Sequence, residues 1–322
     1  MKILRYQADR RTLGIIGAWY ALMAYAWIAS PTGFWPNAAL VALLCMGAFQ
    51  GAVATHNAVH CPVFVARWMN NLWQVVLTLT YGHPVSSYVP GHNLSHHRHT
   101  ESRRDVMRTD KARFRWHLLN LLFFTASIST SIMGAEIKYA RFAAKRRPRF
   151  TRMLILETVC MVAFIGALLA LDWRKALLYV VLPWQYAAWG IVTINLLQHD
   201  GCDPASPWNH SRNFVGPVVN WLAFNNGFHG VHHLKSTLHW SLAPEAHRRL
   251  LAPHIDPRLD EPSLLAYALR TFVLPGGRRN FDGTPRPVRD PGPDEEWITD
   301  DGPVPATSVT SIRMALLRDA AA

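Results

Sequence analysis

The longest stretch without a charged side chain restricts the fold of this protein more than any other feature. No Asp, Glu, Lys or Arg occurs between Thr12 and Ala66. A soluble core cannot easily hold such a run, whereas a lipid bilayer can. Charged residues make up only 17% of the chain, against roughly 25% in soluble proteins. The composition therefore excludes a disordered chain, a disulfide scaffold and an ordinary soluble globule.

Apolar segments of about 20 residues are long enough to cross a bilayer as helices. The charge-free run contains a turn rich in Pro and Gly at residues 31–36, which divides it into two such segments. Two more follow later in the chain, joined by the short polar turn Asp172–Lys175. The four predicted spans are residues 12–30, 36–55, 153–171 and 176–198.

Two further apolar stretches, 68–90 and 116–135, are ambiguous. Lys and Arg gather in three segments, residues 1–11, 98–115 and 138–152. Basic loops favour the cytoplasmic side of a membrane. If all basic segments are cytoplasmic, both apolar stretches must return to the side of the membrane from which they entered, as interfacial or re-entrant segments. The sequence thus predicts an all-α integral membrane protein with four transmembrane helices, six spans being the alternative. Both termini and a histidine-rich cap are expected on the cytoplasmic side.

The remaining organisation follows from composition. Residues 1–275 are expected to form one membrane-embedded catalytic domain, and 276–322, rich in Pro and Gly, a disordered tail. The net charge of +12 is explained by the basic loops beside the spans and their attraction to anionic lipid. We therefore expect a membrane but no nucleic acid as partner.

The histidines gather in a few short motifs. Residues three or four apart share one face of a helix, so the members of each motif are expected to point the same way. On the predicted topology every motif lies at the cytoplasmic end of a span. The motifs are His56-Asn57-Ala58-Val59-His60, His92-Asn93-Leu94-Ser95-His96-His97, His229-Gly230-Val231-His232-His233, and the single His199.

Imidazoles in this number indicate metal binding. Three or four protein ligands hold one zinc ion, so nine histidines suit two ions. Neither the HExxH motif of zinc proteases nor the Glu-x-x-His pattern of carboxylate di-iron proteins is present. An all-histidine, two-metal site beside a membrane indicates iron and dioxygen, because attack on an unactivated C–H bond requires metal–oxygen chemistry.

At these residues the sequence resembles the membrane fatty acid desaturase and hydroxylase superfamily, which carries three histidine boxes. HNAVH, HNLSHH and HGVHH occur here in that order, the last within Asn225-Asn226-Gly227-Phe228-His229. The resemblance implies four membrane helices under a cytoplasmic cap that holds two irons, with dioxygen as co-substrate. It also implies that Asn195, one turn before His199, holds a metal-bound water. His99 shares the face of His92 and His96 and is expected beside the site. The implied ligands are His56, His60, His92, His96, His97, His199, His229, His232 and His233.

The function expected from these features is oxygen-dependent desaturation of a fatty acyl chain, with no catalytic residues beyond the metal ligands. A lipid hydroxylase uses the same ligands and stays an alternative, as does an oxygenase of carotenoids or sphingoid bases. No cytochrome b5-like His-Pro-Gly-Gly motif is present, so a separate carrier such as ferredoxin is expected to supply electrons. The expected location is a bacterial inner membrane.

The alternative from another class is a non-catalytic metal transporter. Such a protein is expected to carry ionisable residues near the middle of its spans. Glu157 is the one acidic residue within the predicted spans, and it lies near a span end. The sequence therefore favours the enzyme.

Overall fold

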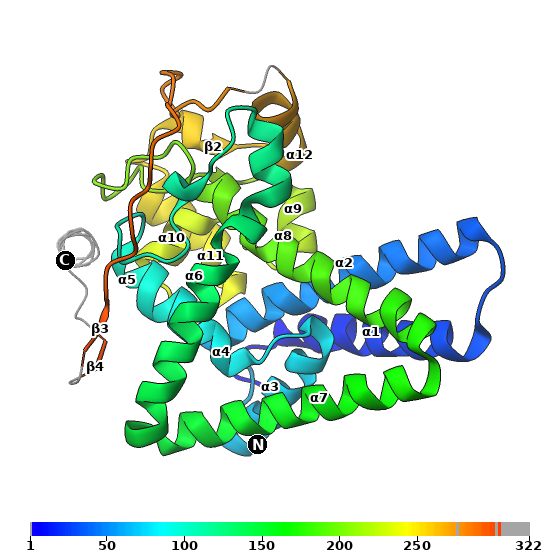
Figure 1. Ribbon diagram of the computed structural model, residues 1–322. Coiled ribbons are helices and arrows are strands. Elements are labelled where there is room, and N and C mark those ends of the chain that lie inside the picture. Colours follow the sequence, from blue (N-terminus) through cyan, green and yellow to red (C-terminus); the bar gives the residue numbers. More distant parts are fainter. Residues whose placement is uncertain (1, 275–276, 300–301, 304–322) are drawn as a thin grey trace. The chain divides into compact units, whose positions relative to one another are not determined.

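The computed structural model describes residues 2–274, 277–299 and 302–303 (Figure 1). Helices dominate this part of the chain, and its strands are all two residues long, which confirms the predicted all-α class. The chain divides into two compact units. The first comprises Met1–Val89 and Ala143–Ile191, and the second comprises Pro90–Phe142 and Val192–Ala322.

The first unit consists mainly of long apolar helices. Ser30 and Gly82 adopt left-handed backbone conformations (φ 43° and 76°) directly after two of these helices and end them. The helices are α1 (Asp9–Ala29), α2 (Phe34–His60), α3 (Arg67–Tyr81), α4 (Val85–Val89), α7 (Pro148–Ala176), η3 (Leu177–Val181) and the first part of α8 (Leu182–His199).

Among the described residues, four helices are long and apolar enough to cross a membrane: α1, α2, α6 (His117–Arg146) and the continuous stretch Pro148–His199. The last contains 52 residues, and a straight helix of that length would span ~78 Å, more than twice a bilayer core. Asp172 interrupts it with non-helical angles (φ −159°, ψ 96°). Its Oδ1 accepts hydrogen bonds from the backbone N–H of Arg174 and Lys175, both at 3.1 Å. The predicted turn between two spans is confirmed.

The two ambiguous stretches fold differently from each other. Residues 68–90 form α3 and α4, which have 15 and 5 residues and are too short to span. The stretch predicted as interfacial at 116–135 instead lies in α6, one continuous helix of 30 residues with the length and composition of a span. Its Ser and Thr residues are compatible with a helix, since two of them bond backbone carbonyls one turn back. Ser127 donates to the Phe123 carbonyl at 3.0 Å, and Ser129 donates to the Ala126 carbonyl at 2.9 Å.

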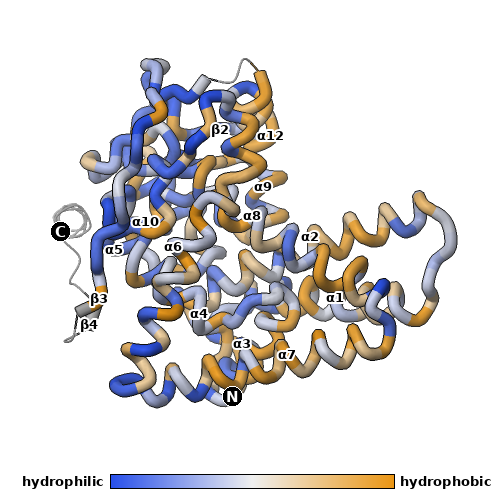
Figure 2. The backbone as a smooth tube through the Cα atoms, viewed as in Figure 1, coloured by the Kyte–Doolittle hydropathy of each residue, from blue (hydrophilic) through white to orange (hydrophobic). Residues whose placement is uncertain are grey.

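Packing in the first unit relies on close contacts between helices. Trp19 donates its indole N–H to the Leu44 carbonyl at 3.0 Å, and a side chain at Gly47 would overlap the same indole. By contrast, α7 leaves large apolar side chains such as Val159 and Val162 exposed. Figure 2 shows apolar residues along α1, α2 and α7. This exposure is what lipid-facing helices require.

The second unit is built from short helices and turns around buried polar side chains. A parallel pairing joins β1 to β2, with Asn213 opposite Asp260. Its elements are η1 (Pro90–His96), α5 (His97–His99), η2 (Thr109–Lys111), most of α6, the end of α8, β1 (Asn213–Phe214), α9 (Pro217–Leu222), α10 (His229–Leu234), η4 (Trp240–Leu242), α11 (Ala243–Ala246), η5 (His247–Leu251), η6 (Pro257–Leu259), β2 (Asp260–Glu261), α12 (Leu264–Ala268), η7 (Leu269–Val273), β3 (Ile298–Thr299) and β4 (Gly302–Pro303).

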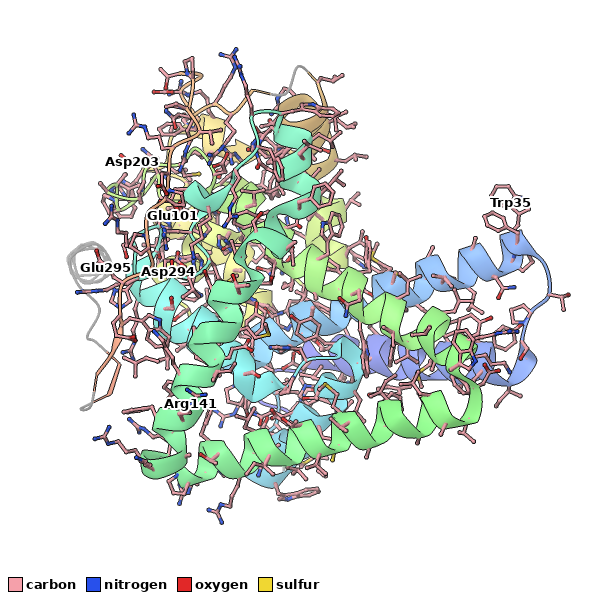
Figure 3. All side chains as sticks on the ribbon, viewed as in Figure 1. Trp35, Glu101, Arg141, Asp203, Asp294 and Glu295 are labelled. Carbon is pink, nitrogen blue, oxygen red and sulfur yellow. The ribbon has the colours of Figure 1, made fainter. Side chains whose placement is uncertain are left out.

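The C-terminal segment, residues 277–299, differs from the predicted disordered tail. Its Arg278 and Trp297 are 5% and 3% exposed, and Trp297 stacks against Tyr139 of α6. Asp294 and Glu295 lie along the second unit in this segment (Figure 3). Charged residues hold the segment in place through ion pairs. Composition alone does not distinguish such residues from solvated ones. The rest of the predicted tail, residues 300–301 and 304–322, lies outside the described residues.

Candidate metal centre

The second histidine box folds as a π-helical turn, η1, followed directly by α5. A π-helix makes i to i+5 hydrogen bonds, so residues five apart come into register. The Nε2 atoms of His92 and His97 accordingly lie 3.1 Å apart. The rings of His92 and His96 stack with centroids 5.6 Å apart, which confirms that they share a face. Their candidate ligand atoms nevertheless belong to different groups.

A first group within the second unit consists of His92, His97 and His232. The Nε2 atom of His97 lies 3.1 Å from that of His92 and 3.0 Å from that of His232. Metal–imidazole bonds of about 2.1 Å place neighbouring ligand nitrogens roughly 3.0–3.4 Å apart in octahedral or tetrahedral geometry. Nitrogens from the second and third boxes thus have the spacing of ligands to one ion.

A second group consists of His96, His199, His229 and His233, whose candidate ligand atoms lie within 4.8 Å of one another. All four side chains are buried. The Nε2 atom of His229 lies 2.8 Å from that of His199 and 3.1 Å from that of His233. Residues 229 and 233 share the group, while His232 points to the first one. The third box therefore supplies ligands to both groups from one short helix.

Hydrogen bonds at Nδ1 orient two of these rings. The Nδ1 of His96 lies 2.8 Å from Oδ2 of the buried Asp105, and the Nδ1 of His199 lies 3.2 Å from the His210 carbonyl. Such partners hold the proton on Nδ1 and leave Nε2 as a ligand atom, as is common at metal sites. The Nε2 of His96 is buried without a hydrogen-bond partner among the described residues. An ion bound there would satisfy it.

The ionisation states in this group also suit metal binding. Burial, and then the neighbouring imidazoles beginning with His97, lower the pKa of His233 well below its usual value. The ring is therefore neutral, which is the form that binds metals. Burial raises the pKa of Asp105, but His96 and the backbone N–H groups of Glu101 and Met107 outweigh it and hold the pKa at about 2. The carboxylate stays charged and can accept the proton of His96.

The third box is positioned by a strained turn and by side-chain bonds. Phe224 and Asn225 adopt left-handed conformations (φ 47° and 57°) in the turn before it. Next to His199, Gln198 donates from Nε2 to the Asn226 carbonyl at 2.9 Å. At the start of α10, the Gly230 N–H donates to Oδ1 of Asn213 at 2.7 Å. These contacts fix α10 against the end of α8 and against β1.

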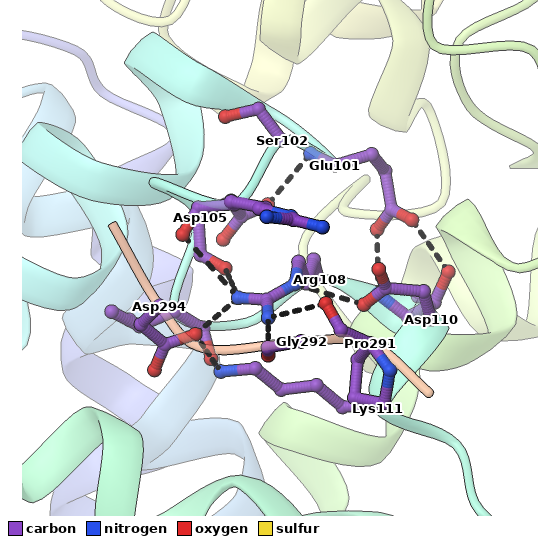
Figure 4. Close-up of polar contacts among 12 residues, drawn as sticks. Glu101, Ser102, Asp105, Arg108, Asp110, Lys111, Pro291, Gly292 and Asp294 are labelled. Atoms are coloured by element: carbon purple, nitrogen blue, oxygen red, sulfur yellow. Dashed lines mark hydrogen bonds and ion pairs between the residues drawn. The ribbon is translucent and has the colours of Figure 1, made fainter. Parts of the chain in front are cut away.

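The second-box loop, residues 101–111, carries Asp105 and is held by the C-terminal segment (Figure 4). The Arg108 side chain is fully buried and donates to the carbonyls of Gly292 and Pro291 at 2.9 and 3.3 Å. Its guanidinium also pairs with Asp294, which lies 2.7 Å from the Lys111 ammonium. Residues almost 200 positions away along the chain thus fix the loop that orients His96.

The remaining predicted site residues are His56, His60, His99 and Asn195. His56 and His60 belong to the first unit, where their rings are neighbours on α2 with centroids 5.2 Å apart. His99 is buried but belongs to neither group described above. Asn195 donates from Nδ2 to the Met107 carbonyl at 3.0 Å and so braces the second-box loop. Its role in holding a metal-bound water stays a prediction.

Sequence reasoning missed the residues that orient the ligands. Asp105 stands in the stretch Arg103–Arg108, which the sequence marks only as a charged region after the second box. An acidic residue closely following a histidine box is a usable signal, because ligating histidines commonly donate Nδ1–H to a carboxylate. The His210 carbonyl leaves no such signal, since any residue has one.

Each of the two groups therefore offers several imidazole nitrogens at a spacing that suits a metal ion. Comparison with known proteins gives the family of the chain. The model of the fatty acid desaturase family matches residues 33–260, and the chain belongs to that family. No curated protein matches the chain. Membership implies an oxidoreductase of the desaturase or hydroxylase type, with a lipid substrate and a membrane setting.

Proposed function

We propose that this protein is a di-iron desaturase that introduces a double bond into a fatty acyl chain with dioxygen. The observation that carries the proposal is the pair of histidine groups in a member of the desaturase family. Nine imidazoles without a carboxylate ligand suit iron and leave room for dioxygen. The proposed ligands include His56 and His60, which are assigned from the box pattern of the sequence alone.

Two bound irons would supply the power to activate dioxygen and to remove hydrogen from an unactivated methylene group. Overall, the acyl chain loses two hydrogens and dioxygen takes up these together with two electrons and two protons, giving an alkene and two waters. The protein's own residues contribute orientation. Asp105 and the His210 carbonyl accept the Nδ1 protons of His96 and His199, so that the Nε2 atom of each ring would be the one to hold an ion.

We further propose that a separate carrier such as ferredoxin delivers the two electrons, because the sequence given has no cytochrome b5-like His-Pro-Gly-Gly motif. The long apolar helices fit an integral membrane protein. We place it in a bacterial inner membrane, with the histidine boxes and both termini on the cytoplasmic side, on the basis of the basic loops.

The test is lipid analysis of a host strain that expresses the chain. Mass spectrometry should detect acyl chains two mass units lighter, and a variant with His229→Ala should produce none. A hydroxylated lipid as main product would overturn desaturation in favour of the hydroxylase. Metal uptake by intact cells without any lipid change would favour the transporter.

A further inference from the structure

A second polar site lies on the second unit, between the second-box loop and the C-terminal segment. It is a cavity of about 420 Å³, within the usual size range of small-ligand pockets. Four arginines line it, together with two aspartates: Arg103, Arg278, Arg286, Arg289, Asp110 and Asp290. A lining of this kind suits a small charged ligand and not an acyl chain.

The inner arginines have carboxylate partners, but they share them. Arg278 is buried, pairs with Asp200 and donates to the Thr109 carbonyl at 3.0 Å. Arg286 lies 3.7 Å from Oδ1 of the same Asp200 and 4.0 Å from Glu101. Asp200 therefore serves two guanidinium groups. The further partner of Arg286, Glu101, is only partly ionised at neutral pH because burial raises its pKa to about 7, so this side of the cavity carries surplus positive charge.

The outer arginines add to that surplus. Arg103 and Arg289 are both exposed, and neither forms an ion pair with a described residue. They come from the loop and from the C-terminal segment, which places two uncompensated cations on one cavity.

The lining carboxylates do not neutralise these outer arginines. Oδ1 of Asp110 lies 2.9 Å from Nε of Arg108, and Arg108 is not part of the cavity lining. Asp290 accepts the Gly292 N–H at 2.9 Å and closes a turn of the C-terminal segment. Burial raises the pKa of Glu101 to about 7, so its charge is incomplete at neutral pH. The four arginines of the lining outnumber its two aspartates, so the cavity favours an anion.

We propose that this cavity binds a phosphate group through Arg103 and Arg289. The guanidinium fork matches the oxygens of phosphate and forms paired, charge-assisted hydrogen bonds with them. A bound phosphate would link the second-box loop to the C-terminal segment. The proposal does not depend on the metal chemistry, because its arginines belong to neither histidine group. The phosphate comes either from solution or from a lipid headgroup.

The experiment uses the purified full-length chain in neutral detergent and measures melting temperature and calorimetric binding during titration with inorganic phosphate. We expect saturable stabilisation of the wild type, and at least tenfold weaker binding by the Arg103→Gln/Arg289→Gln variant. The matched control is Arg113→Gln/Arg115→Gln, two exposed arginines of the same unit that do not line the cavity. It should bind phosphate as the wild type does.

A second arm identifies the source of the phosphate. The chain is placed in nanodiscs of phosphatidylglycerol or of phosphatidylcholine, with sodium chloride matched for ionic strength. Stabilisation by phosphatidylglycerol that the cavity variant loses and the control keeps supports a headgroup. Stabilisation by free phosphate with the same variant pattern supports a soluble ligand. Equal responses of the cavity variant and the wild type in both arms, or an equal effect of sodium chloride, would overturn the proposal.

Discussion

The two units of this protein bury opposite kinds of side chain. The first buries small and apolar residues between long helices, as where Gly82 lies against Trp184, while its helix α7 exposes apolar residues. The second buries histidine, aspartate and arginine in short helices and loops, as where Asp105 meets His96. The difference teaches that apolar packing specifies the scaffold, whereas a polar network specifies the site. Substitutions in the first unit should therefore lower mainly stability, and substitutions in the second should lower mainly activity.

The largest effect is expected from losing a ligand in the second unit. His229→Ala removes an imidazole from the four-histidine group, and we expect lipid product to fall by more than about 100-fold, since even the partners of metal ligands account for 10–100-fold. The measurement is product formation by membranes of an expressing strain. His254→Ala changes an exposed histidine outside both groups and should leave activity intact; a similar loss there would contradict the assignment.

Packing in the first unit is tested at Gly82. An added Cβ would lie 2.2 Å from Trp184, and φ is +76°. Gly82→Ala should therefore destabilise the protein by about 2–4 kcal/mol, from backbone strain and overpacking together. The readout is the melting temperature in detergent. Gly166→Ala, where nothing lies within 4 Å of the added atom, is the matched control, and equal melting temperatures for both variants would refute the packing argument.

The polar network is tested at Asp105. Asp105→Asn retains the shape but removes the charge that holds the Nδ1 proton of His96. We expect a 10–100-fold loss of activity or metal affinity with a smaller loss of stability than Gly82→Ala causes. Asp203→Asn, at an exposed loop aspartate, serves as control. Should Asp105→Asn unfold the protein while the remaining folded fraction is fully active, the carboxylate would be structural only.

The smallest effect concerns pH. Burial raises the pKa of Glu101 from 4.5 to about 7, so the native state holds this proton more tightly than the unfolded state. Ionised Glu101 therefore lowers the free energy of unfolding. This loss is absent below about pH 4.5 and grows as pH rises toward and past 7. Between pH 6 and 8 the wild type should lose about 1 kcal/mol relative to Glu101→Gln. Parallel melting curves across this range would show that Glu101 titrates normally.

Much of the scaffold was predictable because hydrophobic segments and their breaks are local signals. The turn at Asp172 is an example, since one polar residue between two apolar runs caps the following helix. The length of α6 was not predictable in the same way, because its Ser and Thr residues resemble those of an interfacial segment. The C-terminal segment was missed because its anchors, such as Arg108 with Asp294, join remote parts of the chain.

For the candidate site, the sequence predicted the histidines that the second unit gathers, but it did not predict how they divide into groups. Helical spacing correctly placed His92 and His96 on one face, where their rings stack. It did not predict that the π-helical turn, with its i to i+5 hydrogen bonds, brings the Nε2 atoms of His92 and His97 within 3.1 Å of each other. Asp105 and Gln198 were not singled out, since their importance depends on contacts that only the folded chain reveals.

The central claim, that two separate histidine groups each hold an iron, is tested most directly by counting metal in the purified protein. Elemental analysis should find about two irons per wild-type chain. His96→Ala and His97→Ala each alter one group and should each reduce the count to about one. Zinc in place of iron, or an iron content that neither substitution changes, would contradict the account.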